Sequence, residues 1–275
     1  MHGWLKRKPN ILRAALTALA VVLSFAFLGA AALVWPAPSG GKALKKGKLT
    51  VDAGNSADGY ILVSAGKNKK RLKVAVSNGG EKIYYDLNGE GETEVLPLTF
   101  GNGEYTVALY QNAGGNRYSE QGKVKFKVTL GDEYAPFLVP NKWIAYTETT
   151  AAVKQSEELC AGLTDPMAKY EAVKDFIKKN FVYDFIKAVT AQAGTLPDID
   201  ACLSDRRGIC QDLAALACCM LRVQGIPSKM AVGYADKTYH AWCLTYIDGQ
   251  ELFFDPTAEL NAMGKVSTYT AEHYY

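Results

Sequence analysis

The stretch that decides the fold covers residues 208–234 and reads GICQDLAALACCMLRVQGIPSKMAVGY. Residues 210–224 predict a helix, because Gly225 suits the position just after a helix end and Pro227 cannot continue the helix. The residues after the proline are typical of a strand. The stretch therefore predicts a helix that begins at Cys210 and leads into a β-sheet.

Three strands are expected after this helix, at residues 229–234, 239–246 and 251–255. Asp248-Gly249 between the last two is a strong signal for a two-residue hairpin turn. An earlier helix is expected at 165–180, where apolar residues recur at helical spacing behind an Asp-Pro start. Residues 151–275 thus read as an α+β domain with helices first and antiparallel strands after.

The expected turn also sets the pairing register of the hairpin. With a two-residue loop, Ile247 pairs with Gln250, and Trp242 pairs with Asp255 farther out. His240 then lies on the same sheet face as Asp255, as a diagonal neighbour with Cα atoms about 7–8 Å apart. This allows Asp255 to accept a hydrogen bond from His240 and orient its ring, whereas a one-residue slip would separate them.

Cys210 stands at a helix start, where unpaired N–H groups and the positive end of the helix dipole favour an anion such as a thiolate. The same N–H groups can stabilise the oxyanion of a carbonyl under attack. His240 can take and return the proton. Asp212, two residues into the helix, is assigned to the dipole and not to a triad.

Three motifs in this order carry a family resemblance: GICQDLAALACCMLRVQGIPSKMAVGY, YHAWCLTYIDG and FFDPT. Together with FVYD at residues 181–184 they resemble the transglutaminase-like superfamily over about residues 150 to 275. The resemblance implies a papain-like core in which Cys210 is the nucleophile, His240 the general base and acid, and Asp255 the orienting residue. Departures at Lys229, Cys243 and Leu244 lie outside these three positions and concern substrate recognition.

Trp242 shares the predicted face of His240, so we consider it a candidate substrate-binding wall of the cleft, with a core aromatic as the equal alternative. No cofactor or metal site is expected, because the chain has no CxxC motif. Most of the six cysteines are expected to be buried thiols, Cys218 and Cys219 among them. A bond between Cys202 and Cys210, masking an active thiol, is the redox alternative.

Residues 14–35, AALTALAVVLSFAFLGAAALVW, form an uncharged run of 22 residues. As a helix this run would span about 33 Å, enough for a bilayer core. We expect residues 1–13 to be a cytoplasmic head, 14–35 a transmembrane anchor and 36–47 a tether. The alternative is a signal peptide cleaved near the small residues at 30–32, which would make the protein secreted.

Residues 48–130 alternate with period two, with strands expected at 48–52, 59–64, 71–77, 82–87, 92–96, 104–111 and 123–130. This spacing is typical of an immunoglobulin-like β-sandwich. Tyr105 could form a tyrosine corner at the start of a late strand. Residues 131–150 read as a connector between the sandwich and the α+β domain.

Composition narrows the function classes. With 48% hydrophobic and 21% charged residues, the chain has the composition of a globular protein, which excludes collagen-like and wholly disordered classes. Four of its 31 basic residues precede the apolar run, which leaves 27 basic against 28 acidic residues in the rest. A nucleic-acid partner is therefore not expected.

The sequence predicts an extracytoplasmic, membrane-anchored enzyme that performs thiol-dependent acyl transfer on a peptide or carboxamide carbonyl. Resolution of the acyl-enzyme by water would make it a peptidase or amidase, and resolution by an amine a transglutaminase. A peptide or protein substrate is expected, with cell-wall peptide slightly favoured. The alternative is a non-catalytic surface adhesion or assembly protein with a degenerate transglutaminase-like scaffold.

Overall fold

The computed structural model describes residues 33, 35–192 and 194–275. The anchor predicted at 14–35 lies outside them, apart from residues 33 and 35. In the part of the chain that is described, no helix has the length and apolar character needed to cross a bilayer.

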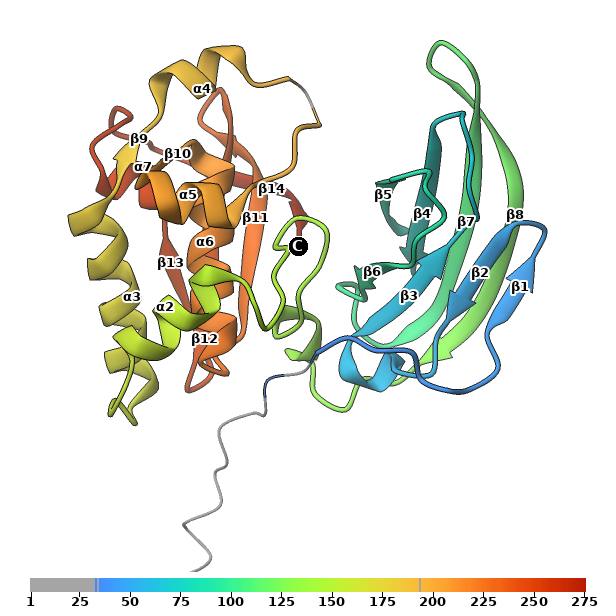
Figure 1. Cartoon of the computed structure of the whole chain (residues 1–275), viewed down its shortest axis with the longest axis horizontal. Coiled ribbons are helices and arrows are strands. Elements are labelled where there is room, and N and C mark those ends of the chain that lie inside the picture. The colour runs from blue at the N-terminus through green and yellow to red at the C-terminus, as the bar shows by residue number, and fades with distance from the viewer. Residues whose placement is uncertain (1–32, 34, 193) are drawn as a thin grey trace, which may run out of the picture. The chain divides into compact units, whose positions relative to one another are not determined.

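Two four-stranded antiparallel sheets make up the N-terminal β-region (Figure 1). One has the order β1-β2-β3-β6 and the other β5-β4-β7-β8. The strand bounds are β1 (Leu44–Lys46), β2 (Leu49–Asp52), β3 (Tyr60–Ser64), β4 (Leu72–Asn78), β5 (Glu81–Leu87), β6 (Glu94–Pro97), β7 (Gly103–Gly114) and β8 (Arg117–Val128). Alternate apolar residues of both sheets, such as Val63 and Val107, are fully buried in one hydrophobic core.

All seven strands predicted in this region are present, with ends that shift by a few residues. Strand β1 was not foreseen, because residues 44–46 lie inside the predicted tether. Lys45 and Lys46 are both exposed, and the strand lies at the edge of the sheet. Because two of its three residues are charged and exposed, the strand shows no alternation of apolar and polar residues. Pairing with β2 supplies the backbone hydrogen bonds that the local sequence does not reveal.

The hydrogen bonds expected of a tyrosine corner are present at Tyr105. Its hydroxyl accepts from the backbone N–H of Phe100 at 3.0 Å. It also lies 3.1 Å from the carbonyl oxygen of Leu98 and 3.0 Å from that of Gly101. The buried ring thereby fixes the chain just before β7.

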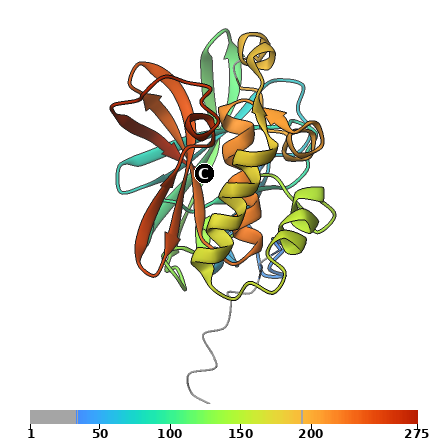
Figure 2. The ribbon, with the colours of Figure 1, turned by 90° about the vertical axis from the view of Figure 1, so that its left-hand side faces the viewer.

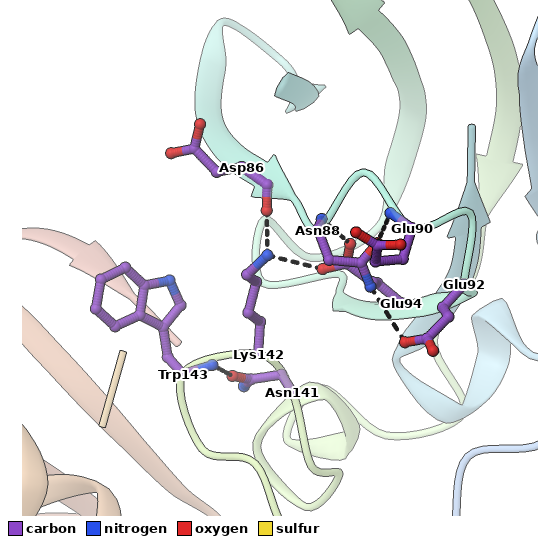
Figure 3. Close-up of polar contacts among 8 residues, drawn as sticks. All are labelled: Asp86, Asn88, Glu90, Glu92, Glu94, Asn141, Lys142 and Trp143. Atoms are coloured by element: carbon purple, nitrogen blue, oxygen red, sulfur yellow. Dashed lines mark hydrogen bonds and ion pairs between the residues drawn. The ribbon is translucent and has the colours of Figure 1, made fainter. Parts of the chain in front are cut away.

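The connector is held against the β-region by polar contacts (Figure 3). The side chain of Asn141 accepts from the backbone N–H of Trp143 at 2.9 Å and shapes the turn. Lys142 then reaches Glu94 at 2.8 Å and also donates to the carbonyl oxygen of Asp86. The side chains of Lys142 and Glu94 are 16% and 13% exposed, so the ion pair is shielded from solvent and holds the connector in place.

The C-terminal domain packs helices against an antiparallel sheet of order β13-β12-β11-β14 (Figures 1 and 2). Its helices are α2 (Ala151–Leu159), α3 (Pro166–Asn180), α4 (Phe185–Thr190), α5 (Ile199–Asp205), α6 (Cys210–Val223) and α7 (Pro256–Glu259). Its strands are β9 (Val182–Tyr183), β10 (Arg207–Gly208), β11 (Ser228–Ala235), β12 (Thr238–Ile247), β13 (Gln250–Phe254) and β14 (Tyr269–Tyr274). Outside this domain, single 3₁₀ turns occur at Ser56–Asp58 in the β-region and at Ala135–Phe137 in the connector.

Helix α6 is the central element of this domain. Every residue from position 212 to 222 is buried, and the helix contacts β11 and β12 as well as α2, α3 and α5. At its C-terminal end the buried Arg222 donates to the carbonyl oxygens of Ser228, Val139 and Tyr275 at 2.5–2.9 Å. Three acceptors satisfy the buried guanidinium, so the far end of the helix that carries Cys210 is firmly held.

The hairpin register predicted from the sequence is confirmed. Asp248 and Gly249 both have positive φ, of 51° and 74°, as a two-residue turn of this kind requires. Ile247 pairs with Gln250, and the ladder continues without a shift to the pair of Cys243 and Phe254. The next position along each strand is that of Trp242 and Asp255. Strand β14 was not foreseen; it pairs with β11 and completes the sheet.

Candidate active site

The start of α6 presents free backbone donors beside a cysteine. The carbonyl oxygen of Ile209 accepts from the N–H groups of Asp212 and Leu213 at 3.0 and 3.1 Å. The preceding N–H groups, of Cys210 and Gln211, have no acceptor among the described residues. Cys210 itself is partly exposed, unlike the other five cysteines, which are buried.

Buried contacts fix the position of this helix start. The carboxylate of Asp212 is fully buried, accepts from the N–H of Ile209 at 3.0 Å and pairs with Lys187 at 2.7 Å. This is the structural role expected for Asp212. A Cβ on Gly208 would lie 2.8 Å from Cβ of Asp212 and 2.9 Å from Sγ of Cys202, so a larger residue does not fit.

His240 and Asp255 meet as the register predicted. Nε2 of His240 lies 2.9 Å from Oδ2 of Asp255, and the two residues are 4% and 2% exposed. Because Asp255 occupies Nε2, the other ring nitrogen is free for a second partner. The Cys210 thiol lies close enough to the ring to contribute, with Asp255, to the pKa of His240.

The surroundings of His240 favour its charged form. Burial lowers the pKa of the ring, but the hydrogen bond to Asp255 and the interactions with the Asp255 carboxylate and the Cys210 sulfur outweigh burial and raise the pKa from 6.5 to about 9. At neutral pH the ring is therefore an imidazolium. An imidazolium in this position can serve as a general acid.

Each carboxylate oxygen of Asp255 accepts hydrogen bonds from two donors. Oδ1 accepts from the N–H groups of Thr257 and Ala258, at 2.9 and 3.2 Å, and so caps α7. Oδ2 accepts from His240 and from the hydroxyl of Tyr269, the latter at 2.8 Å. Burial raises the pKa of Asp255, but these bonds and the His240 charge more than compensate, so the pKa lies below 3.8.

Tyr269, on β14, is a site residue that the sequence did not reveal. Besides its bond to Asp255, its ring packs against Trp242 and Phe253, with centroids 5.1 and 4.7 Å apart. The only signal in the sequence is an aromatic residue at the start of an alternating stretch, which says nothing about its partner.

One comparison with known protein families covers the segment that holds this site. Residues 153–256 match the family model of the transglutaminase-like superfamily. These residues form a transglutaminase-like domain. The match begins in α2 and ends just after Asp255, so it contains Cys210, His240 and Asp255 but none of the β-region.

A search of solved structures also finds matches at low sequence identity. A candidate cysteine protease from Cytophaga hutchinsonii is 18% identical with a TM-score of 0.40, over 70% of this chain and 68% of that one. The periplasmic domain of TgpA from Pseudomonas aeruginosa is 15% identical with a TM-score of 0.37, over 80% and 73%. A TGase structure is 19% identical with a TM-score of 0.35, over 45% of this chain and 33% of its own length. No curated protein matches the sequence.

Trp242 lies on the face of His240, as predicted, but it is only 2% exposed. Its ring stacks near that of His240, with centroids 6.3 Å apart, and contacts Tyr269 on the other side. A side chain with so little accessible surface can orient the His240 ring but offers almost nothing for a substrate to contact. The structure therefore favours the core alternative for Trp242.

The transglutaminase-like domain has a cavity of about 310 Å³ beside its carboxylate, lined by Asp255, Phe253 and Lys178 among others. A larger cavity of about 830 Å³ is lined by the connector, by Glu94 and Val95 and by Trp35, and none of the three proposed catalytic residues lines it. Across the described residues, no group of three or more His, Cys, Asp or Glu side chains could hold a metal ion.

Proposed function

We propose that this protein is a thiol-dependent acyl-transfer enzyme in which Cys210, His240 and Asp255 act as a triad on a peptide or carboxamide carbonyl. The observation that carries the proposal is the position of His240, between the Asp255 carboxylate at 2.9 Å and the thiol at the start of α6. This arrangement joins a nucleophile, a proton carrier and an orienting carboxylate.

In the first step the Cys210 thiolate attacks the carbonyl carbon, and the oxyanion forms next to the free N–H groups of Cys210 and Gln211. The imidazolium of His240 gives its proton to the leaving amine as the C–N bond breaks. An acyl-enzyme thioester and a neutral imidazole remain. Asp255 holds the ring by Nε2 throughout, so the other nitrogen stays directed at the reaction.

In the second step the neutral imidazole of His240 takes a proton from water or an amine, which attacks the thioester carbon and releases Cys210 as thiolate. Water gives a carboxylic acid, and an amine gives a new amide. We propose hydrolysis of a peptide substrate, with cell-wall peptide as the favoured class. The basis is the predicted export of the domain.

We also propose that the enzyme is a single-pass membrane protein with an extracellular body, or is secreted if the N-terminal run is cleaved. The uncharged run at 14–35 is the basis for this placement. For the β-region we propose an immunoglobulin-like sandwich. The sheet orders β1-β2-β3-β6 and β5-β4-β7-β8 and the corner at Tyr105 support this assignment.

A non-catalytic scaffold is the competing function. A scaffold has no need for a buried carboxylate bonded to a buried histidine beside a cysteine that is free and partly exposed. The buried pair is costly to keep unless it is used, which favours the enzyme.

The test is alkylation of the full-length protein with iodoacetamide across pH, with each cysteine quantified by mass spectrometry. Cys210 is expected to react rapidly at pH 7, because the His240 imidazolium stabilises its thiolate. In His240→Ala the rate at pH 7 should fall by about tenfold or more, since only a few per cent of an ordinary thiol is ionised there. Because the His240 proton is lost as pH rises through about 9, this difference should shrink above that pH.

Cys160 is the internal standard for this experiment, since it is buried and burial raises the pKa of its thiol. Labelling of Cys210 no faster than Cys160 would contradict an assembled pair and turn attention to the scaffold alternative.

Tyr269→Phe is expected to reduce kcat on an activated ester by about threefold to tenfold, since it removes one hydrogen bond to the Asp255 carboxylate. That bond helps to lower the pKa of Asp255, so its loss should move the acidic limb of the pH–rate profile to higher pH. Tyr274→Phe on the same strand is the matched control. An unmoved acidic limb would limit Tyr269 to packing.

A further inference from the structure

Two cysteines that the proposed chemistry does not use lie in contact inside the C-terminal domain. Sγ of Cys218 on α6 is 3.3 Å from Sγ of Cys243 on β12, and both residues are fully buried. No other pair of cysteine sulfurs makes such a contact among the described residues, and all six thiols are free. The adjacent Cys219, also fully buried, has no sulfur partner there.

The surroundings of the pair differ for the two sulfurs. Hydrogen bonding with Cys218, and also with Thr245 at 3.5 Å, lowers the pKa of Cys243 in spite of its burial. Burial raises the pKa of Cys218. In the folded domain the two sulfurs face each other in contact, away from solvent.

The position of the pair connects it to the site. Cys218 lies eight residues after Cys210 on α6, and Cys243 lies three residues after His240 on β12. A covalent link between them would join the helix that carries the proposed nucleophile to the strand that carries the proposed base. Such a link would hold the two elements in one relative position.

We propose that Cys218 and Cys243 are a disulfide-forming pair that staples α6 to β12 when the chain folds in an oxidising compartment. One of the two cysteines, as its thiolate, attacks one sulfur of an external disulfide, that of oxidised glutathione or of a thiol–disulfide oxidoreductase, and expels one thiolate. The other cysteine, as its thiolate, then attacks the first in the mixed disulfide and expels the second. Both protons leave with the released thiols, and the two electrons lost by the pair reduce the external disulfide.

Complete burial places this reaction before α6 closes on the sheet, during folding. The link closes a loop of about 25 residues, and the chain-entropy model then predicts substantial stabilisation. The proposal stands apart from the catalytic role of Cys210, because it needs only the contact between α6 and β12.

The test is refolding of the full-length chain from urea with a glutathione redox mixture, followed by alkylation in denaturant and peptide mapping. We expect two fewer alkylated cysteines than in the reduced protein and a melting temperature about 10 °C higher. The tryptic peptide 208–222 contains Cys210, Cys218 and Cys219, so variants must identify the bonded sulfur. Cys218→Ala should lose the link, whereas Cys219→Ala and Cys210→Ala should keep it.

The double variant Cys218→Ala/Cys243→Ala should keep the wild-type circular dichroism spectrum and lose the response of its melting temperature to reductant. Six free thiols after oxidative refolding would overturn the proposal, and so would a link that survives in Cys218→Ala. Because Cys210→Ala abolishes only the proposed enzyme activity, failure of the link and failure of the proposed function are told apart.

Discussion

Replacement of Cys210 by Ala is expected to abolish formation of an acyl-enzyme with an activated ester and to lower kcat by at least about 10⁴-fold. The reason is that Cys210 stands at the start of α6, where N–H groups are free for an oxyanion, and contributes to the pKa of the nearby His240 ring. The measurement is the intact mass of the full-length protein after brief exposure to a p-nitrophenyl ester, combined with the release of p-nitrophenol.

The matched control for this substitution is Cys202→Ala. Cys202 is close in the sequence, but it is buried and burial raises the pKa of its thiol to about 12, so it should not be acylated. The adduct should persist in Cys202→Ala. An adduct that remained in Cys210→Ala, on another cysteine, would remove Cys210 from the role of nucleophile.

Asp255→Asn is expected to lower kcat/KM by about 10³ to 10⁴-fold, although it changes few atoms. Oδ1 accepts from the N–H groups of Thr257 and Ala258, so an asparagine must keep its oxygen on that side. Its NH₂ group then faces Nε2 of His240 and the Tyr269 hydroxyl. A donor in that position cannot accept the Nε2 proton, so it disfavours the imidazolium that pairs with the thiolate.

The reverse amide orientation is no better, because it sets an NH₂ group against the two N–H donors of α7. The decisive readout is iodoacetamide labelling of Cys210 at pH 7, which should slow together with the loss of activity. Labelling at the wild-type rate, with activity intact, would mean that His240 does not depend on Asp255 for its charge.

Asp165→Asn provides the matched control for this variant. Asp165 is also followed by proline and also caps a helix, accepting from the N–H of Ala168 at 3.0 Å. Asparagine is as good an N-cap as aspartate, so this variant should keep its stability and its activity. A comparable loss in Asp165→Asn would indicate a general effect on helix capping.

The sequence by itself determined the parts of the site that depend on local geometry. A Gly-Pro signal ends the predicted helix near Gly225, and the observed α6 begins at Cys210 as expected. Asp248-Gly249 allows a two-residue turn, and because side chains alternate along a strand, that turn alone placed His240 and Asp255 on one face. Seven of the eight strands of the β-region, β2 to β8, followed from the same alternation.

Only the tertiary structure decided which side chains from distant segments meet. Tyr269 reaches Asp255 because β14 pairs with β11, and an exposed, alternating stretch carries no signal for its partner strand. The predicted cleft-wall Trp242 is covered by Tyr269, since burial depends on what packs over a face and not on the face itself. The contact between Cys218 and Cys243 arises in the same way, from how a helix is seated on a sheet, and pairings across such separations are set by packing of the whole domain.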